Sequence, residues 1–276
     1  MSAEARSEAA GLFGPGSVSW RVDRELIVLA GGSCALLLQA AHPSVAAGVT
    51  QHSTYATDPF GRLMRTLESS FAVVFGSRSE AEATLRRVNA IHAAVRGQRP
   101  DGRPYSAMEP EALLWVHATL VDTALRVYGR FVAPLSAEDE QRYHEESSAV
   151  GLALGIRPAD MPATILELRA WMEGMIAGGG VRVTPDARRI ARTVLYPTRV
   201  PPRIAWDVAH LVSLSALPVA IRRQYGIGWS DARERGMGHL AAISRHLLPR
   251  VPALLRTAPQ AREADRRVAQ AGAGTR

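Results

Sequence analysis

The sequence predicts an all-α fold: a single multi-helix domain of about ten helices. Helix start and stop signals bracket one segment after another, and no segment shows the strict alternation of period two that is typical of strands. With 47% hydrophobic residues, the 276-residue chain can bury a sizeable core. Because neither a repeat nor a linker divides it, we expect one domain over 21–257, preceded by an N-terminal extension (1–20) and followed by a disordered tail (258–276).

The first predicted element is a buried helix over 26–41, which is too short and too interrupted by polar and glycine residues to span a bilayer. The next helix follows the turn at Pro59. Capping residues, prolines and glycines then delimit the remaining elements. These are expected from a capping box at Ser79 and Glu82 to Arg96, from Pro110 to about Phe131, from Ser136 to about Leu154, from Pro162 to about Gly178, from Pro185 to Leu195, from Ile204 to Tyr225, and from Ser230 into the 240s.

Composition excludes several classes of function. The chain has no lysine, so all 33 basic residues are arginines, and Schiff-base enzymes and Walker-type nucleotide sites are excluded. A net charge of +7 suggests nucleic acid, but the arginines are scattered and aromatics make up only 6% of the residues, so we expect no nucleic-acid partner. The single cysteine, Cys34, indicates a reducing compartment, and the first ten residues do not resemble a signal peptide; we therefore expect a cytoplasmic protein.

Two histidines lie on apolar helix stripes. His92 recurs with Leu85, Val88 and Val95 at helical spacing, and His117 follows Leu113 by four residues on the next helix. A buried imidazole must be hydrogen-bonded or bound to something. Each could be a satisfied core histidine, whereas the pair on consecutive helices favours a buried planar cofactor such as haem.

Upstream, Arg62, Arg65 and Thr66 share one face of the helix that follows Pro59. Two guanidinium groups and a hydroxyl there could hold carboxylates such as haem propionates, or orient bound oxygen. The other interpretation is an ordinary first turn with surface arginines.

An ordered set of short motifs over roughly 20–255 resembles the DUF2236 family, which includes the MpaB-type oxygenases and the latex-clearing proteins. These motifs are His42-Pro43, His52-Ser53, Asp58-Pro59, Arg62-Leu-Met-Arg65-Thr66, Ile91-His92-Ala-Ala-Val95-Arg96-Gly97, Tyr105-Ser-Ala-Met-Glu-Pro110 and Leu114-Trp-Val-His117-Ala118.

The resemblance implies a globin-like core around non-covalent haem b and dioxygen-dependent cleavage of carbon–carbon double bonds in isoprenoid chains. The family's proximal iron ligand corresponds to His92, followed by Arg96, and its distal motif to Arg62, Arg65 and Thr66. His117 is implied as a neighbour of the haem, or as the ligand itself. No counterpart of the distal glutamate of the latex-clearing proteins is found; Ala46 and His52 lie near where it would be sought, and His52 is a further candidate cofactor-binding residue. Arg65 replaces a lysine that can bind the iron in latex-clearing proteins.

The main hypothesis is therefore a cytoplasmic haem b oxygenase that acts with dioxygen on a small apolar substrate, isoprenoids among the candidates. The catalytic residues would be Arg62, Arg65 and Thr66, and His92 would bind the iron. Two alternatives stay open: a non-catalytic protein that binds haem or another apolar ligand, and a cofactor-free interaction protein that binds anionic partners. The substrate and the oligomeric state stay open as well.

Overall fold

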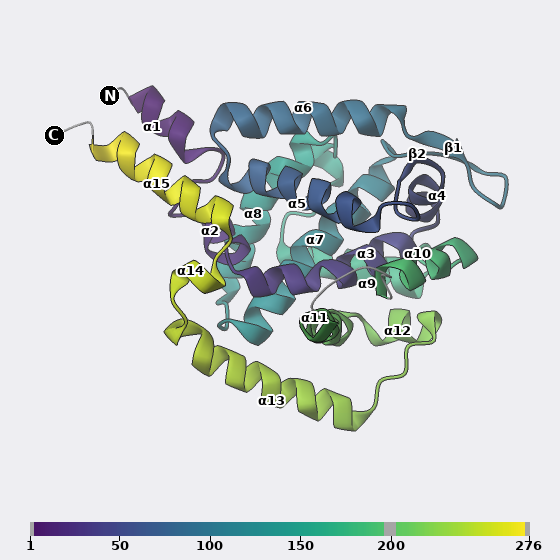
Figure 1. Ribbon diagram of the computed structural model, residues 1–276. Coiled ribbons are helices and arrows are strands. Elements are labelled where there is room, and N and C mark those ends of the chain that lie inside the picture. Colours follow the sequence, from purple (N-terminus) through teal and green to yellow (C-terminus); the bar gives the residue numbers. More distant parts are fainter. Residues whose placement is uncertain (1–2, 196–202, 274–276) are drawn as a thin grey trace.

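The computed structural model describes residues 3–195 and 203–273 of the chain, and Figure 1 shows their arrangement. Within these residues the α-helices are α1 (Ala3–Ala10), α2 (Val18–Asp23), α3 (Gly32–Ala41), α4 (Pro43–His52), α5 (Pro59–Phe75), α6 (Arg78–Ala94), α7 (Pro110–Phe131), α8 (Ala137–Ala153), α9 (Ile165–Ala177), α10 (Pro185–Leu195), α11 (Arg203–Ala216), α12 (Val219–Tyr225), α13 (Asp231–Leu247), α14 (Ala253–Arg256) and α15 (Pro259–Ala273). Three 3-10 helices, η1 (Leu26–Gly31), η2 (Pro158–Asp160) and η3 (Leu248–Arg250), and two short strands, β1 (Arg96–Gln98) and β2 (Pro104–Ser106), complete the set. The predicted all-α class is confirmed, although the helices are more numerous than expected.

Helix α7 is the centre of the core. It begins at Pro110 and ends at Phe131, as the sequence predicts, and most of its side chains are buried. The indole of Trp115 is fully buried and donates a hydrogen bond from Nε1 to the backbone oxygen of Leu38 on α3 (2.8 Å). Helices α3, α8, α13 and η1 pack around α7. The core helix is thus fixed by a polar contact as well as by apolar packing.

Several predicted helix caps are confirmed. The Ser136 and Ser230 side chains accept hydrogen bonds from backbone N–H groups three residues on, at 3.0 and 3.2 Å, and Thr184, the residue before the predicted start at Pro185, does the same for α10 at 3.2 Å. The capping box of α6 is formed by Ser77 and Glu80 instead of the predicted pair two residues later. The hydroxyl and N–H of Ser79 bind the carboxylate of Glu8 on α1, so this serine joins two elements instead of capping one.

Two predicted helices are divided. The expected helix over 204–225 breaks at Pro218 into α11 and α12, because proline lacks the N–H that would continue the ladder. The buried segment 26–41 is a 3-10 helix followed by α3. At this junction the backbone of Gly31 approaches α7 so closely that a Cβ would lie 2.8 Å from the Cγ2 of Thr123.

A small hairpin replaces the predicted last turn of α6. The helix ends at Ala94, and β1 pairs antiparallel with β2, with Gly97 opposite Tyr105. The connecting turn contains Pro100-Asp-Gly102, and Gly102 has a positive φ of 81°. Arg96 therefore lies on a strand and not on the helical face of His92.

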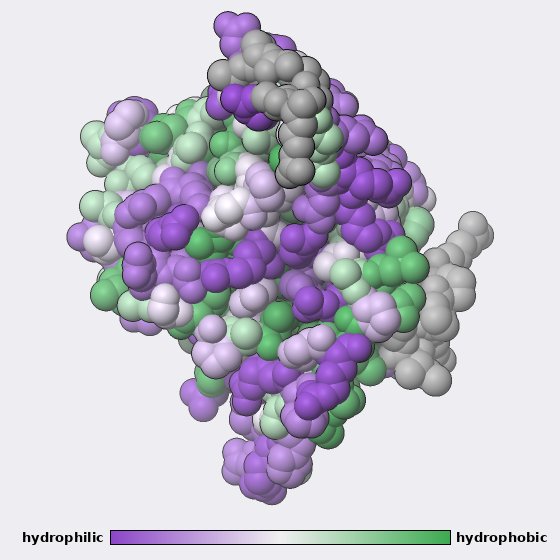
Figure 2. All heavy atoms as spheres, turned by 90° about the vertical axis from the view of Figure 1, so that its left-hand side faces the viewer, coloured by the Kyte–Doolittle hydropathy of each residue, from purple (hydrophilic) through white to green (hydrophobic). Residues whose placement is uncertain are grey.

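The C-terminal segment differs most from expectation. Residues of the predicted disordered tail form α15, which packs on α1 and α5. The buried residues of this helix are small: Ala261, Ala264 and Ala271 form an alanine stripe. The prediction of a disordered tail was based on the scarcity of large apolar residues, so it missed this stripe. Figure 1 shows α1 and α15 side by side at the edge of the fold, and Figure 2 looks onto that side, where hydrophilic residues surround separate apolar patches.

No single helix among the described residues is long and apolar enough to cross a membrane. The segments Leu26–Ala41 and Pro43–His52 meet the length and composition criteria only together, and they are bent by 105°.

Candidate functional site

Helices α5 and α6 form an antiparallel hairpin that carries four of the predicted site residues, namely Arg62, Arg65 and Thr66 on α5 and His92 on α6. A hydrogen bond from the Arg87 guanidinium to Ser69 Oγ (3.3 Å) shows which residues of the two helices lie side by side. His92 is five residues beyond Arg87, and Arg62 is seven residues before Ser69. At a rise of about 1.5 Å per residue, the two lie within roughly 3 Å of the same level along the hairpin. The structure therefore brings His92 and Arg62 to the same end of α5–α6.

His92 is half-buried, and its Nδ1 is enclosed without a hydrogen-bond partner among the described residues. Burial lowers the pKa of His92 below its usual value, so the imidazole is neutral at pH 7. Helix α6 is anchored on both sides of it. Asn89 Nδ2 donates to the backbone oxygen of Ala153 (2.8 Å), and Val95 lies against Gly48, where a Cβ would be 3.4 Å from Val95 Cγ1. His92 thus sits between contacts to the end of α8 and to α4.

Arg62 is also half-buried, and no carboxylate among the described residues pairs with its guanidinium. Its pKa is lowered first by burial and then by the positive charge of Arg65. A guanidinium stays protonated at any ordinary pH, so Arg62 is a partly desolvated cation without a counter-ion. Such a group can bind an anionic ligand.

Arg65 and Thr66 are engaged differently. The Arg65 guanidinium is exposed and binds the Asp58 carboxylate (3.1 Å) and Thr54 Oγ1 (2.9 Å), which tie it to the turn before α5. The Thr66 hydroxyl is exposed and donates to the backbone oxygen of Arg62 (2.9 Å) within its own helix. Of the three predicted distal residues, only Arg62 keeps its polar group unpaired in the structure.

His117 on α7 is a second enclosed imidazole. Its Nε2 has no partner within the described part of the chain, and a Cβ on Gly151 of α8 would lie 3.2 Å from its Nδ1. Burial, with a smaller effect of His144, lowers the pKa of His117 to about 4. His117 is therefore neutral near pH 7, as an iron ligand must be, and the geometry leaves both histidines as candidates.

His52 and Arg96 lie beside the β1–β2 hairpin. Both side chains are exposed, and His52 Nε2 is 3.2 Å from the backbone oxygen of Arg96. The predicted pairing of His92 and Arg96 on one helix face does not form, because α6 ends between them. These two predicted cofactor-binding residues therefore contact each other through the backbone.

Two polar residues near the site were not predicted. Asn89 lies one turn before His92 and positions α6 through its hydrogen bond to the backbone oxygen of Ala153. The sequence could have indicated this role, because Asn89 is an amide on an otherwise apolar stripe of the helix. His42 is buried between α3 and α4, with its Nε2 3.4 Å from the Glu111 carboxylate at the start of α7. Burial lowers the pKa of His42 despite this acidic neighbour.

Within 3–195 and 203–273, no group of three or more His, Cys, Asp or Glu side chains lies close enough to share a metal ion. A haem needs no such cluster, because the porphyrin supplies four nitrogen ligands and the protein adds one or two. The enclosed, unpaired nitrogens of His92 and His117 are suited to that role, and the unpaired Arg62 is suited to a propionate.

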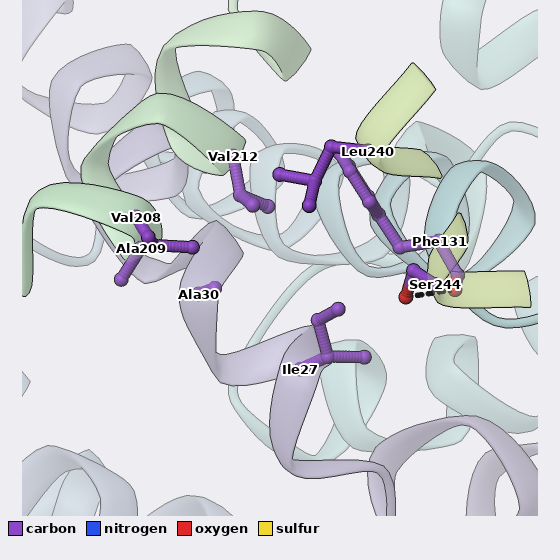
Figure 3. Close-up of a pocket in the computed structure, with 8 residues that line it drawn as sticks. All are labelled: Ile27, Ala30, Phe131, Val208, Ala209, Val212, Leu240 and Ser244. Carbon is purple, nitrogen blue, oxygen red and sulfur yellow. Dashed lines mark hydrogen bonds between the residues drawn. The ribbon is translucent and has the colours of Figure 1, made fainter. Parts of the chain in front are cut away.

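An apolar cavity of about 180 Å³ lies elsewhere, between η1, α7, α11 and α13 (Figure 3). Its lining is aliphatic and aromatic apart from Ser244, whose hydroxyl donates to the backbone oxygen of Phe131 (2.7 Å). Phe131 is fourteen residues from His117 on α7, which corresponds to roughly 20 Å along the helix axis. The cavity is therefore separate from the histidine site.

Comparison with known protein families identifies the class. Residues 20–246 match the family described as ER-bound oxygenase mpaB/B'/Rubber oxygenase, catalytic domain. The match covers most of the chain, so the protein belongs to this family of oxygenase catalytic domains, and the resemblance inferred from its motifs is confirmed. No curated protein and no solved structure matches the chain.

Proposed function

We propose that this protein is a haem b-dependent oxygenase that cleaves a carbon–carbon double bond in a small apolar substrate, with isoprenoids as the first candidates. Membership of the oxygenase family supports the reaction type. The observation that carries the cofactor assignment is the pair formed by His92 and Arg62: a neutral imidazole with an enclosed, unpaired nitrogen, and an unpaired guanidinium at the same level of the hairpin.

The residues fit the cofactor on chemical grounds. A neutral imidazole has one acceptor nitrogen, which can bind iron, and one N–H. In His92 the structure provides no internal partner for the enclosed nitrogen, so ligand binding would use bonding capacity that the protein leaves free. The cation of Arg62 would neutralise a propionate carboxylate, and partial desolvation strengthens that attraction.

The remaining polar residues have supporting parts in the proposal. Arg65, held by Asp58 and Thr54, would add positive charge beside Arg62 and stabilise negative charge that develops on oxygen. Thr66 would contribute its hydroxyl from the following turn. His117 would lie beside the cofactor, and it is the alternative ligand if His92 is not.

Apolar surface near this site supports an apolar ligand. Ile91, next to His92, is 56% exposed, and Met64 on α5 is 39% exposed. Leu120, one turn from His117, is 50% exposed although α7 is otherwise the core helix. A hydrophobic cofactor or substrate lying against these side chains would remove them from water.

Haem, when bound, would activate dioxygen, and the protein would orient the substrate and exclude water from it. Cleavage of one double bond by one O₂ gives two carbonyl groups, each carrying one oxygen atom, so the reaction needs no external reductant. The proposed reaction therefore requires no partner that donates electrons.

We also propose a cytoplasmic location, which the single, buried Cys34 supports.

The cofactor is tested by titrating the purified protein with haem and following the Soret band. Arg62→Ala should weaken haem binding by about tenfold, because a charge-assisted contact is lost. Arg86→Ala is the matched control, since Arg86 lies on the same hairpin but its side chain is 72% exposed. Equal affinities of the two variants would contradict the role of Arg62.

The reaction is tested with the haem-loaded protein, an unsaturated isoprenoid such as squalene, and ¹⁸O₂. The proposal predicts oxygen consumption and carbonyl products that each carry one labelled atom. Haem binding without turnover of any unsaturated isoprenoid would instead support a non-catalytic haem protein.

A further inference from the structure

The chain between Glu234 and Glu263 contains no acidic residue, whereas it contains five arginines: Arg235, Arg245, Arg250, Arg256 and Arg262. This stretch covers most of α13, all of η3 and α14, and the start of α15. Only Arg256 forms an ion pair among the described residues, with Glu25 (2.9 Å). The stretch is therefore a concentration of positive charge.

Three of the other four arginines of this stretch are bonded in a way that leaves their charge uncompensated. Arg245 donates to the backbone oxygen of Arg130 (3.0 Å), Arg250 to that of His246, and Arg262 to that of Thr257 (2.9 Å). A backbone carbonyl orients a guanidinium but does not neutralise it. These side chains are thus held in place with their positive charge available to a partner.

Large apolar side chains are exposed within the same stretch. Leu254 and Leu255 on α14 are 67% and 68% exposed, and Ile243 and Leu247, one turn apart on α13, are 55% and 51% exposed. We call these four residues, together with Arg250 and Arg262, the α13–α14 patch. Figure 1 shows α13 and α14 along the outer edge of the fold, where a large flat partner can reach them.

From this combination we infer that the α13–α14 patch docks the protein on the surface of an anionic lipid bilayer. Leucines that enter the boundary between headgroups and acyl chains, with arginines at the level of the phosphates, are the pattern by which proteins lie on a membrane without crossing it. The inference rests on the surface alone and does not depend on the proposed oxygenase activity.

Other partners fit the patch less well. Residues 235–262 contain no Phe, Trp or Tyr, so the stretch lacks the rings on which single-stranded nucleic acids stack. A symmetric pairing with a second copy would bring two patches of the same positive charge together. An acidic protein could neutralise the arginines, but the four exposed aliphatic side chains would need an additional apolar counterpart.

The test is co-sedimentation of the full-length protein with vesicles of phosphatidylcholine alone or mixed with phosphatidylserine, at low and high salt. We expect binding to the mixed vesicles that weakens as salt increases. The double variant L254S/L255S should bind at least tenfold more weakly, because two side chains no longer enter the apolar layer. Replacing Arg250 by Gln should weaken binding about fivefold.

Matched controls carry the same changes elsewhere. Leu166→Ser alters a 72% exposed leucine on α9, and Arg86→Gln alters an exposed arginine on α6; both should bind like the unchanged protein. Circular dichroism melts check that all variants are folded. The inference would be overturned by no binding to the mixed vesicles, by equal binding of L254S/L255S, or by a concentration-dependent dimer in light scattering that L254S/L255S abolishes. Binding to polyglutamate as tight as to vesicles would likewise overturn it, in favour of an acidic protein partner.

Discussion

The buried state of His117 predicts a specific loss of stability in acid. In the folded protein its pKa is lowered to about 4 from an ordinary value of 6.5, because burial disfavours the charged ring. The unfolded chain therefore binds the proton first as the pH falls, and stability decreases between these two values. A difference of 2.5 pKa units corresponds to at most about 3 kcal/mol, of which about 2 kcal/mol is lost between about pH 7 and about pH 5.

The variant His117→Gln removes this titration while keeping a polar side chain. Urea unfolding at the two pH values should show that the variant loses about 2 kcal/mol less stability on acidification than the unchanged protein. His239→Gln, on the exposed surface of α13, serves as the control and should follow the unchanged protein. If His117→Gln loses as much stability as the unchanged protein, His117 is not the enclosed neutral group described above.

Three further substitutions or deletions test the packing. Gly31→Ala should destabilise by about 2 kcal/mol in urea unfolding, because its Cβ would lie 2.8 Å from a stiff threonine side chain on α7; Gly32→Ala, with open space around its Cβ, should not. Trp115→Phe should lower the free energy of unfolding by about 3 kcal/mol, since a buried carbonyl loses its donor and a cavity forms; a loss below about 1 kcal/mol would contradict this. Deleting α15 should cost at least about 2 kcal/mol, because the surfaces of α1 and α5 that its alanine stripe covers become exposed to water; an unchanged melting temperature would show that the helix contributes nothing.

The sequence predicted the fold class and the long helices because their signals are local. The start of α7 at a proline and the serine caps of α8 and α13 depend on residues within one turn of each other. The division of residues 26–41 could not be predicted, since it depends on how closely Gly31 approaches a helix that lies nearly a hundred residues away. The helix α15 was missed because its buried stripe consists of alanines.

The candidate site was predictable in part. The spacing of apolar residues predicted that His92 and His117 lie on apolar helix stripes. In the structure both imidazoles are neutral, and each has one enclosed nitrogen without a hydrogen-bond partner among the described residues. The helical spacing also placed Arg62 and Arg65 on one face of α5, but it could not predict which of them binds a residue outside the helix. The turn before α5 supplies Asp58, which binds Arg65 and leaves Arg62 as the free cation. The end of α6 at Ala94 could not be predicted, because it depends on the pairing of Arg96 with Ser106 in the hairpin that follows.

The most direct test of the account is haem binding by a variant with its proposed iron ligand removed. The unchanged protein should bind one haem and show a Soret band. His92→Gly should lose that band, and added imidazole should restore it by occupying the space of the missing ring, whereas His117→Gly should keep it. If His92→Gly binds haem with an unchanged spectrum, or if the unchanged protein binds no haem, the central claim is contradicted.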